Sequence, residues 1–289
     1  MLAGFAAFSC GDLMAKLLTA DYHPVQIAFS RQLGAVAAVA VLFAMKGSAI
    51  LRSTAPKLQV ARGLCAVVSA TSFIFAISYV PLADAVAVTF AAPFMVTVLG
   101  AVVLREAVDP KRWIAVTVGF IGTLVIIRPG FGVFHPAIFL VLLAAAAFAL
   151  RQIISRYIGR RDRTMTTLAY TALTSVIVLA IPMPLIWITP VSIVDLAMMA
   201  GVAIMAGMGE FLLIRALEIA AVVVVAPMQY SLILYGTLWG YLVFAELPDR
   251  WTWMGTSIIV GSGLYMLYLE RQRTLLLLRQ HALTQRSPE

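Results

Sequence analysis

Long apolar runs separated by short polar connections dominate the chain. Broken at proline, glycine and charge clusters, they predict helices close to the ~20 residues needed to cross a bilayer. Inside hydrocarbon the backbone has to satisfy its own hydrogen bonds, so the runs predict helices and not strands. The ten predicted helices cover residues 2–19, 24–45, 58–79, 82–104, 111–128, 136–157, 164–187, 193–216, 220–244 and 251–270.

The chain repeats itself with an offset of 140 residues. The stretch GAVVLREAVDPKRW at 100–113 recurs as GYLVFAELPDRWTW at 240–253, and Ala-Ala-Phe at 6–8 recurs at 146–148. The repeat predicts two units, residues 1–135 and 136–273, followed by a tail at 274–289. Each unit holds five predicted helices, and an odd number of spans makes the units cross the membrane in opposite directions.

The distribution of basic residues predicts which loops face the cytoplasm. With the N-terminus placed inside, most of the 21 lysines and arginines fall on the cytoplasmic side. Only Lys16, Arg128 and Arg250 fall outside, and Arg31 and Arg151 lie within spans. Both termini are therefore expected in the cytoplasm. The net charge of +8 reflects this bias and does not indicate nucleic-acid binding.

Composition excludes a soluble domain, since 62% of the residues are hydrophobic and the mean hydropathy is +0.99. The sequence contains no GxxxxGK[ST] motif, and its three histidines lack metal-ligand spacing. We therefore expect neither a cofactor nor a metal. Cys10 and Cys65 lie in apolar stretches and are expected to be buried small hydrophobes.

Two five-helix repeats, each closing with Gly-x5-Glu-x2-Asp and a final apolar helix, resemble the EamA type of the drug/metabolite transporter superfamily. The resemblance extends through Glu270 and implies an all-α membrane protein with ten transmembrane helices. It further implies a central cavity and the export of small metabolites. Within the superfamily the chain looks most similar to bacterial aromatic amino-acid exporters of the YddG kind.

Charged residues inside predicted spans are the strongest pointers to function, because a charge at the bilayer centre is costly. The acids are Asp12 and Glu210, and the bases are Arg31 and Arg151. Either acid is expected to meet a substrate ammonium or to titrate, and Arg151 to meet a carboxylate. Structural ion pairs explain each residue equally well. For Arg31 the structural explanation is favoured, because its position near the end of its helix lets the side chain extend toward the interface.

Repeat-related positions add polar and aromatic candidates. Asp12 corresponds to Gln152, and Phe90 corresponds to Tyr230; rings beside hydrogen-bonding groups suit a substrate with a flat apolar side chain. Ordinary helix packing is the alternative explanation for such aromatics. The candidate substrate-binding residues are Ser9, Asp12, Phe90, Phe94, Arg151, Gln152, Ser155, Glu210, Gln229, Tyr230 and Tyr235.

The acids of the repeated motif are expected to fix the loops that contain them. Glu106 and Glu246 stand beside Asp109 and Asp249, where capping of the following helix is expected and gating is the alternative. A GxxxG pattern at 236–240 is explained equally by internal packing and by a dimer seam.

These features predict a secondary exporter of small metabolites, aromatic or neutral amino acids above all, working by alternating access. Proton coupling and facilitated diffusion are both compatible with the sequence. Other metabolites or cationic drugs are the alternative substrates. An enzyme is not expected, because the nearest match to an intramembrane GxGD motif, at 9–12, lacks its first glycine. A channel is disfavoured by the absence of a TVGYG-like filter.

Overall fold

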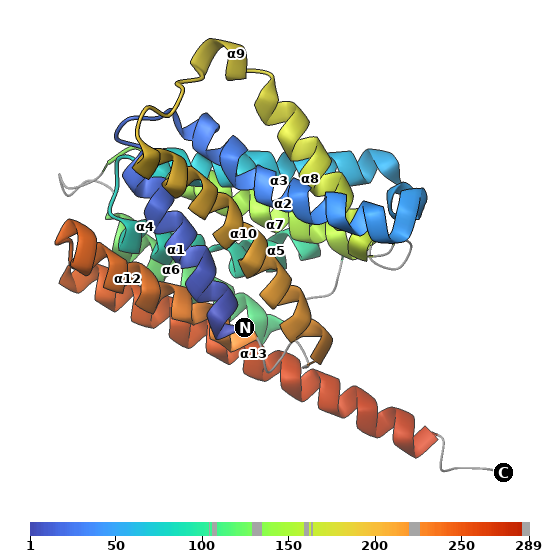
Figure 1. The fold of residues 1–289 in the computed structure, drawn as a ribbon. Coiled ribbons are helices and arrows are strands. Elements are labelled where there is room, and N and C mark those ends of the chain that lie inside the picture. The colour runs from blue at the N-terminus through green and yellow to red at the C-terminus, as the bar shows by residue number, and fades with distance from the viewer. Residues whose placement is uncertain are drawn as a thin grey trace.

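The computed structural model describes residues 1–103, 105, 109–128, 135–158, 162, 164–219 and 226–284, and every regular element among them is a helix (Figure 1). The elements are α1 (Leu2–Leu18), α2 (Pro24–Lys46), η1 (Gly47–Leu51), α3 (Pro56–Ile77), α4 (Leu82–Thr89), α5 (Ala92–Val103), α6 (Pro110–Ile127), α7 (Ile138–Ile158), α8 (Thr164–Ala180), α9 (Met183–Ile186), α10 (Ile193–Ile219), η2 (Ala226–Tyr230), α12 (Ser231–Phe244) and α13 (Arg250–Thr284), of which η1 and η2 are 3-10 helices.

Proline and a preceding side chain start several helices where the sequence predicts them. Proline is favoured in the first turn because its missing N–H would have no partner there. Before Pro24, the His23 ring accepts a hydrogen bond from the Val25 N–H at 3.3 Å. Before Pro110, the Asp109 carboxylate accepts from the Lys111 N–H at 2.7 Å. With these caps, α2 and α6 begin within a few residues of their predicted starts.

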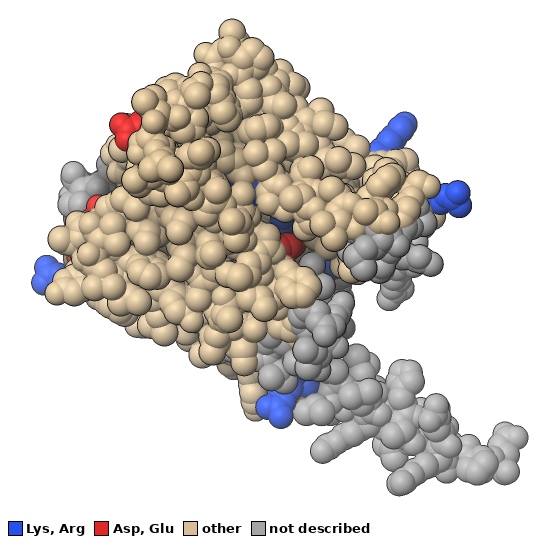
Figure 2. Space-filling view, viewed as in Figure 1, with Lys and Arg blue, Asp and Glu red and all other residues tan. Residues whose placement is uncertain are grey.

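The surface of the helices is suited to lipid. Six stretches of the described helices are long and apolar enough to cross a membrane, and one of them comprises both α4 and α5. Large apolar side chains stand exposed along these and the shorter helices, among them Ile114 at 61%, Ile177 at 63% and Leu242 at 61%. Figure 2 shows a broad face almost free of charge, with most lysine, arginine and acidic groups at its margins. The predicted all-α polytopic class is confirmed.

One predicted helix, 82–104, is broken in the structure. It forms α4 and α5, separated by a turn at Phe90 and Ala91. Pro93 follows at once and cannot donate a backbone hydrogen bond to the preceding turn, which explains the break. The repeat-related position in the second unit is also irregular, since the 3-10 helix η2 precedes α12 there. Both units therefore depart from a continuous α-helix at the same place.

Helix packing follows the repeat. The offset of 140 residues relates α1 to α7 and α3 to α10, and α1 packs along α10 as α3 packs along α7. Helix α6 packs along α13, as Figure 1 shows beneath the other helices. The backbones of α2 and α10 approach each other closely at Gly34, where an added Cβ would lie 2.0 Å from the Ala203 carbonyl oxygen. This approach needs glycine at position 34.

The connection between α1 and α2 is tied to the segment that joins α9 to α10. The Tyr22 hydroxyl donates to Asp195 at 2.9 Å. The fully buried Gln26 amide binds Ile188 twice, donating to its carbonyl at 2.7 Å and accepting from its N–H at 3.0 Å. We call this set the first junction.

A second junction lies at the other end of α2. Asp162, between α7 and α8, accepts hydrogen bonds from the Ser53 hydroxyl, from the Thr54 N–H at 2.9 Å and from the Gln59 amide at 2.9 Å. The offset of 140 residues relates Asp162 to Tyr22, so the two junctions occupy equivalent places in the two units. A helix of 23 residues, about 34 Å long, separates them.

Candidate functional site

Asp12 forms an ion pair with Arg31 of the neighbouring helix. The Asp12 Oδ1 to Arg31 Nη1 distance is 2.7 Å, and the two side chains are 13% and 20% exposed. Ser9, one turn earlier on α1, is buried. Arg31 therefore forms an ion pair between helices, in line with the structural role favoured for it, but its side chain extends to Asp12 rather than to the membrane interface.

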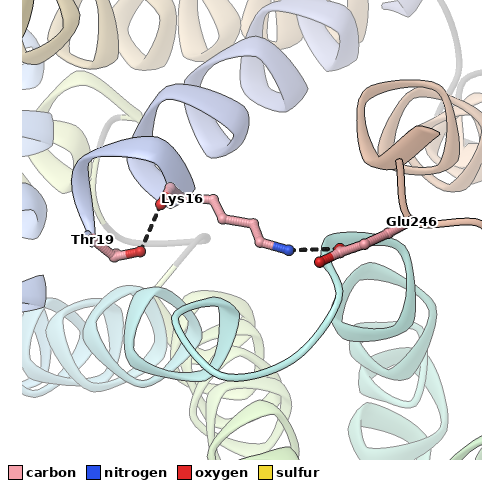
Figure 3. Close-up of polar contacts among 3 residues, drawn as sticks. All are labelled: Lys16, Thr19 and Glu246. Atoms are coloured by element: carbon pink, nitrogen blue, oxygen red, sulfur yellow. Dashed lines mark hydrogen bonds and ion pairs between the residues drawn. The ribbon is translucent and has the colours of Figure 1, made fainter. Parts of the chain in front are cut away.

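Lys16, on the same face of α1, holds the segment after α12. Its Nζ lies 2.8 Å from the Glu246 Oε2 and 4.3 Å from the centre of the Phe244 ring (Figure 3). The Thr19 hydroxyl donates to the Lys16 carbonyl at 2.6 Å, which closes the end of α1. Glu246 thus fixes its loop through Lys16 of α1 rather than by capping α13.

Capping falls to the aspartates of the repeated motif. Asp249 accepts from the Thr252 N–H at 2.8 Å and pairs with Arg128 at 2.5 Å, as Asp109 accepts from Lys111. Partial burial opposes ionisation of Asp249, but the bonds from Thr252 and the Arg128 charge outweigh it and lower its pKa. The caps are therefore the aspartates and not the glutamate Glu246 for which capping was expected, and Glu106 lies outside the described residues.

A recess opens in the face shown in Figure 2, between α2 and α10, and both acidic and basic groups are visible within it. Charge in an otherwise apolar helical bundle requires a partner, water or a ligand. Besides the Asp12–Arg31 pair, the described helices hold three charged residues that interact electrostatically: Arg62 on α3, Arg151 on α7 and Glu210 on α10.

The helices α3 and α7 bring two guanidinium groups together. Arg62 Nε donates to the Ser155 hydroxyl at 2.7 Å, and Arg62 Nη1 donates to Thr171 Oγ1. Ser155 in turn donates to the Arg151 carbonyl one turn earlier, at 2.7 Å. The hydroxyl of Ser155 is therefore occupied in orienting Arg62 along the face of α7 that carries Arg151.

Arg151 has an incomplete set of partners. Its guanidinium lies 4.8 Å from the centre of the Phe148 ring, a cation–π contact. In the part of the chain that the structure describes, its buried Nε has no hydrogen-bond partner. Glu210 is exposed and lies close enough to interact electrostatically with both Arg62 and Arg151. Two positive charges thus share the Glu210 carboxylate.

The discontinuous helices bring two aromatic candidates into contact. Phe90, at the break between α4 and α5, stacks on Tyr230 at the end of η2, with ring centres 5.0 Å apart and planes inclined by 27°. The Tyr230 hydroxyl rests on α13, where a Cβ on Gly263 would lie 1.7 Å from it. Discontinuous helices that meet in the interior are a frequent location of transporter binding sites.

The remaining candidates lie in different surroundings. Gln152, Gln229 and Tyr235 are half-buried on α7, η2 and α12. Phe94 is buried and packs onto α6, where a Cβ on Gly119 would lie 2.1 Å from its ring. Phe94 is therefore a packing residue in this conformation. Among the described residues no group of three or more histidine, cysteine, aspartate or glutamate side chains is placed to hold a metal ion.

Arg62 is the member of this group that sequence reasoning missed. It lies less than two turns into α3, and the distribution of basic residues assigns it to the cytoplasmic side with the loop charges. Its side chain turns into the bundle because it donates hydrogen bonds to Ser155 of α7 and Thr171 of α8, and these contacts between helices are visible in the structure alone.

Comparison with known proteins identifies related chains. The model of the EamA-like transporter family matches residues 1–128 and 135–269. An S-adenosylmethionine uptake transporter of Rickettsia prowazekii is 29% identical over 94% of this chain and 92% of its own. A riboflavin transporter of Brucella anthropi is 27% identical, over 84% and 87% of the two chains. A pseudopaline exporter of Pseudomonas aeruginosa is 26% identical, over 90% and 91%.

The fold also has a counterpart among solved structures. A protein crystal structure with 19% sequence identity superposes with a TM-score of 0.62, covering 94% of this chain and 97% of that one. At this level of identity the likeness concerns the arrangement of the helices alone.

Proposed function

Because the chain belongs to the EamA-like transporter family, we propose that it carries a small metabolite with a flat ring and an amino-acid carboxylate across the bacterial inner membrane. Aromatic and other neutral amino acids are the first candidates. The observation that carries the proposal is the interaction of Glu210 with both Arg62 and Arg151 in an otherwise apolar bundle. A carboxylate suits the guanidinium groups, and an ammonium group suits Glu210.

The related proteins bear on the substrate class. They are named for S-adenosylmethionine, riboflavin and pseudopaline, and not for aromatic amino acids. S-adenosylmethionine and riboflavin each contain a flat ring system, and S-adenosylmethionine is also an amino acid. A substrate that joins a ring to an amino-acid group agrees with these names and with the stacked pair Phe90 and Tyr230. Export is the direction favoured by the sequence resemblance, although the relatives include proteins named for uptake as well as export.

Alternating access is the mechanism that the packing supports. Two pseudo-symmetric units can exchange conformations and open a shared site to either side in turn. The first and second junctions fit this scheme, because they tie equivalent loops at opposite ends of α2. Opening the site on one side would release one junction while the other holds. We place both termini in the cytoplasm, as the distribution of basic residues predicts.

Counterflow in reconstituted vesicles tests the transport proposal. Vesicles loaded with unlabelled phenylalanine or tryptophan should accumulate the labelled amino acid in a saturable manner, and S-adenosylmethionine and riboflavin should be tested as competitors. Abolition of proton-gradient dependence by Glu210→Gln would assign coupling to that carboxylate. Single-channel current steps, or uptake that no competitor saturates, would contradict a carrier.

Labelling tests the proposed topology. In a variant with Cys10 and Cys65 replaced by alanine, Arg105→Cys and Leu247→Cys place single thiols in the repeat-related loops, and both positions are exposed. Inverted units predict that a membrane-impermeant maleimide labels these thiols from opposite sides. Labelling of both from one side would remove the basis for alternating access between inverted units.

A further inference from the structure

We infer that Arg62 and Arg151 together bind the carboxylate of the transported metabolite, and that Arg62 is a specificity-determining residue of this site. The inference rests on the proposed function and deepens it, since it names the substrate group that the site selects.

The first support is the incomplete pairing of the two guanidinium groups. Arg62 is held by hydroxyl groups, those of Ser155 and Thr171, which supply no negative charge. Arg151 contacts the face of Phe148 and, among the described residues, its Nε lacks an acceptor. Glu210 is the carboxylate that interacts with both. Two guanidinium groups and one carboxylate leave a positive charge that an anionic ligand would balance.

The second support is the way the two units differ at this place. In the first unit Arg31 has Asp12 as its counter-ion. The repeat offset puts Gln152 at the position of Asp12 and Thr171 at the position of Arg31. Two neutral residues in the second unit therefore occupy the positions of the ion pair in the first unit. One of them, Thr171, accepts a hydrogen bond from Arg62 and orients its side chain. Gln152 and Thr171 therefore offer no negative charge to Arg62 and Arg151, whose guanidinium groups can bind an anionic ligand.

The third support is the geometry of guanidinium groups. Their planar forks recognise carboxylates through paired hydrogen bonds, and such bonds are stronger away from bulk water. Two adjacent forks repel each other when no anion lies between them, so a substrate carboxylate gains from both. An amine of the same shape would instead add a positive charge to the site. The site is thus expected to reject cationic drugs that lack a carboxylate.

A series of ligands with one ring and different charges tests the inference. The ligands are phenyllactate, phenylalanine, phenyl phosphate and phenethylamine, with dissociation constants taken from the shift in unfolding temperature of the detergent-purified protein. We expect phenyllactate and phenylalanine each to bind at least about tenfold more tightly than phenethylamine, as loss of one charge-assisted contact would cause. Phenyl phosphate shows whether the site takes any oxyanion or a carboxylate alone. Equal binding of the acid and the amine would overturn the inference.

Variants locate the effect at Arg62. Arg62→Gln should reduce the preference for acid over amine by about tenfold, while Arg62→Lys keeps part of it. Lys57→Gln is the matched control, because it removes one positive charge from the exposed start of the same helix. The unfolding temperature of each variant without ligand reports whether it folds. If Arg62→Gln and Lys57→Gln, both folded, retain the same preference, Arg62 does not bind the carboxylate.

The same measurements with cyclohexyl analogues separate this inference from the proposed function. These compounds keep the charged groups but lose the flat ring. If the aromatic preference is absent, the cyclohexyl acid should still bind about tenfold more tightly than the cyclohexyl amine. If neither series distinguishes acid from amine, or if no acid in either series binds, the carboxylate inference fails, whatever the outcome of the counterflow experiment.

Discussion

The ion pair between Asp12 and Arg31 makes a quantitative prediction about the role of Asp12. Removing one partner of a buried ion pair costs about 3–5 kcal/mol, because the other charge is left buried alone. The two side chains retain 13% and 20% exposure, so water screens part of the remaining charge. We therefore expect Asp12→Asn to cost about 2–3 kcal/mol. At about 2–4 °C per kcal/mol, the unfolding temperature should fall by about 4–12 °C.

The double variant Asp12→Asn/Arg31→Gln separates packing from transport. It removes both charges, so its stability should return to within about 1 kcal/mol of the parent. If the pair only packs α1 against α2, counterflow should recover along with the unfolding temperature. Asp21→Asn is the control, since Asp21 is exposed in the connection between the same helices. A double variant that regains stability but transports no better than Asp12→Asn would refute the packing role and assign Asp12 to substrate or proton.

Three further changes test the packing and the loops. Gln26→Leu removes the two hydrogen bonds between Gln26 and Ile188 and should cost about 1–3 kcal/mol by thermal unfolding, whereas an unchanged unfolding temperature would show that these two bonds add no stability. Gly34→Ala should lower the unfolding temperature strongly, because its Cβ would meet backbone at 2.0 Å; Gly261→Ala, with nothing within 4 Å, is the control and should not. For Asp162, partial burial is outweighed by the hydrogen bonds it accepts, which lower its pKa from 3.8 to about 2. Its contribution is therefore present above about pH 4 and lost as the pH falls toward 2, so the stability gap to Asp162→Asn should narrow between pH 6 and pH 3.

Helix positions could be read from the sequence because the bilayer imposes one length and one polarity on every span. Caps sharpened the boundaries, as at Asp109 before α6. The break at Phe90 could not be read with the same certainty, because a proline inside a span is compatible with a kinked continuous helix. The predicted helix 82–104 accordingly contains α4, a turn and α5.

The charged site was predictable only in part. A charge in the middle of a span, such as Arg151 or Glu210, stands out against apolar neighbours. Arg62 does not, because near a helix end an arginine is equally suited to the cytoplasmic interface. Which acid pairs with which base is a question of tertiary contact between helices. The sequence therefore left Asp12 with several candidate partners, and packing selects Arg31.

The two junctions at the ends of α2 differ in chemistry, so each can be weakened separately. The first combines two amide hydrogen bonds, which do not titrate in the ordinary pH range, with the bond from Tyr22 to Asp195; the second is centred on the Asp162 carboxylate. Under the proposed alternating access, weakening one junction by about 1 kcal/mol, with the other left intact, would shift the ratio of the inward-facing and outward-facing states about fivefold. Point substitutions far from the transported molecule could therefore enrich a chosen state for crystallisation or for selecting conformation-specific antibodies.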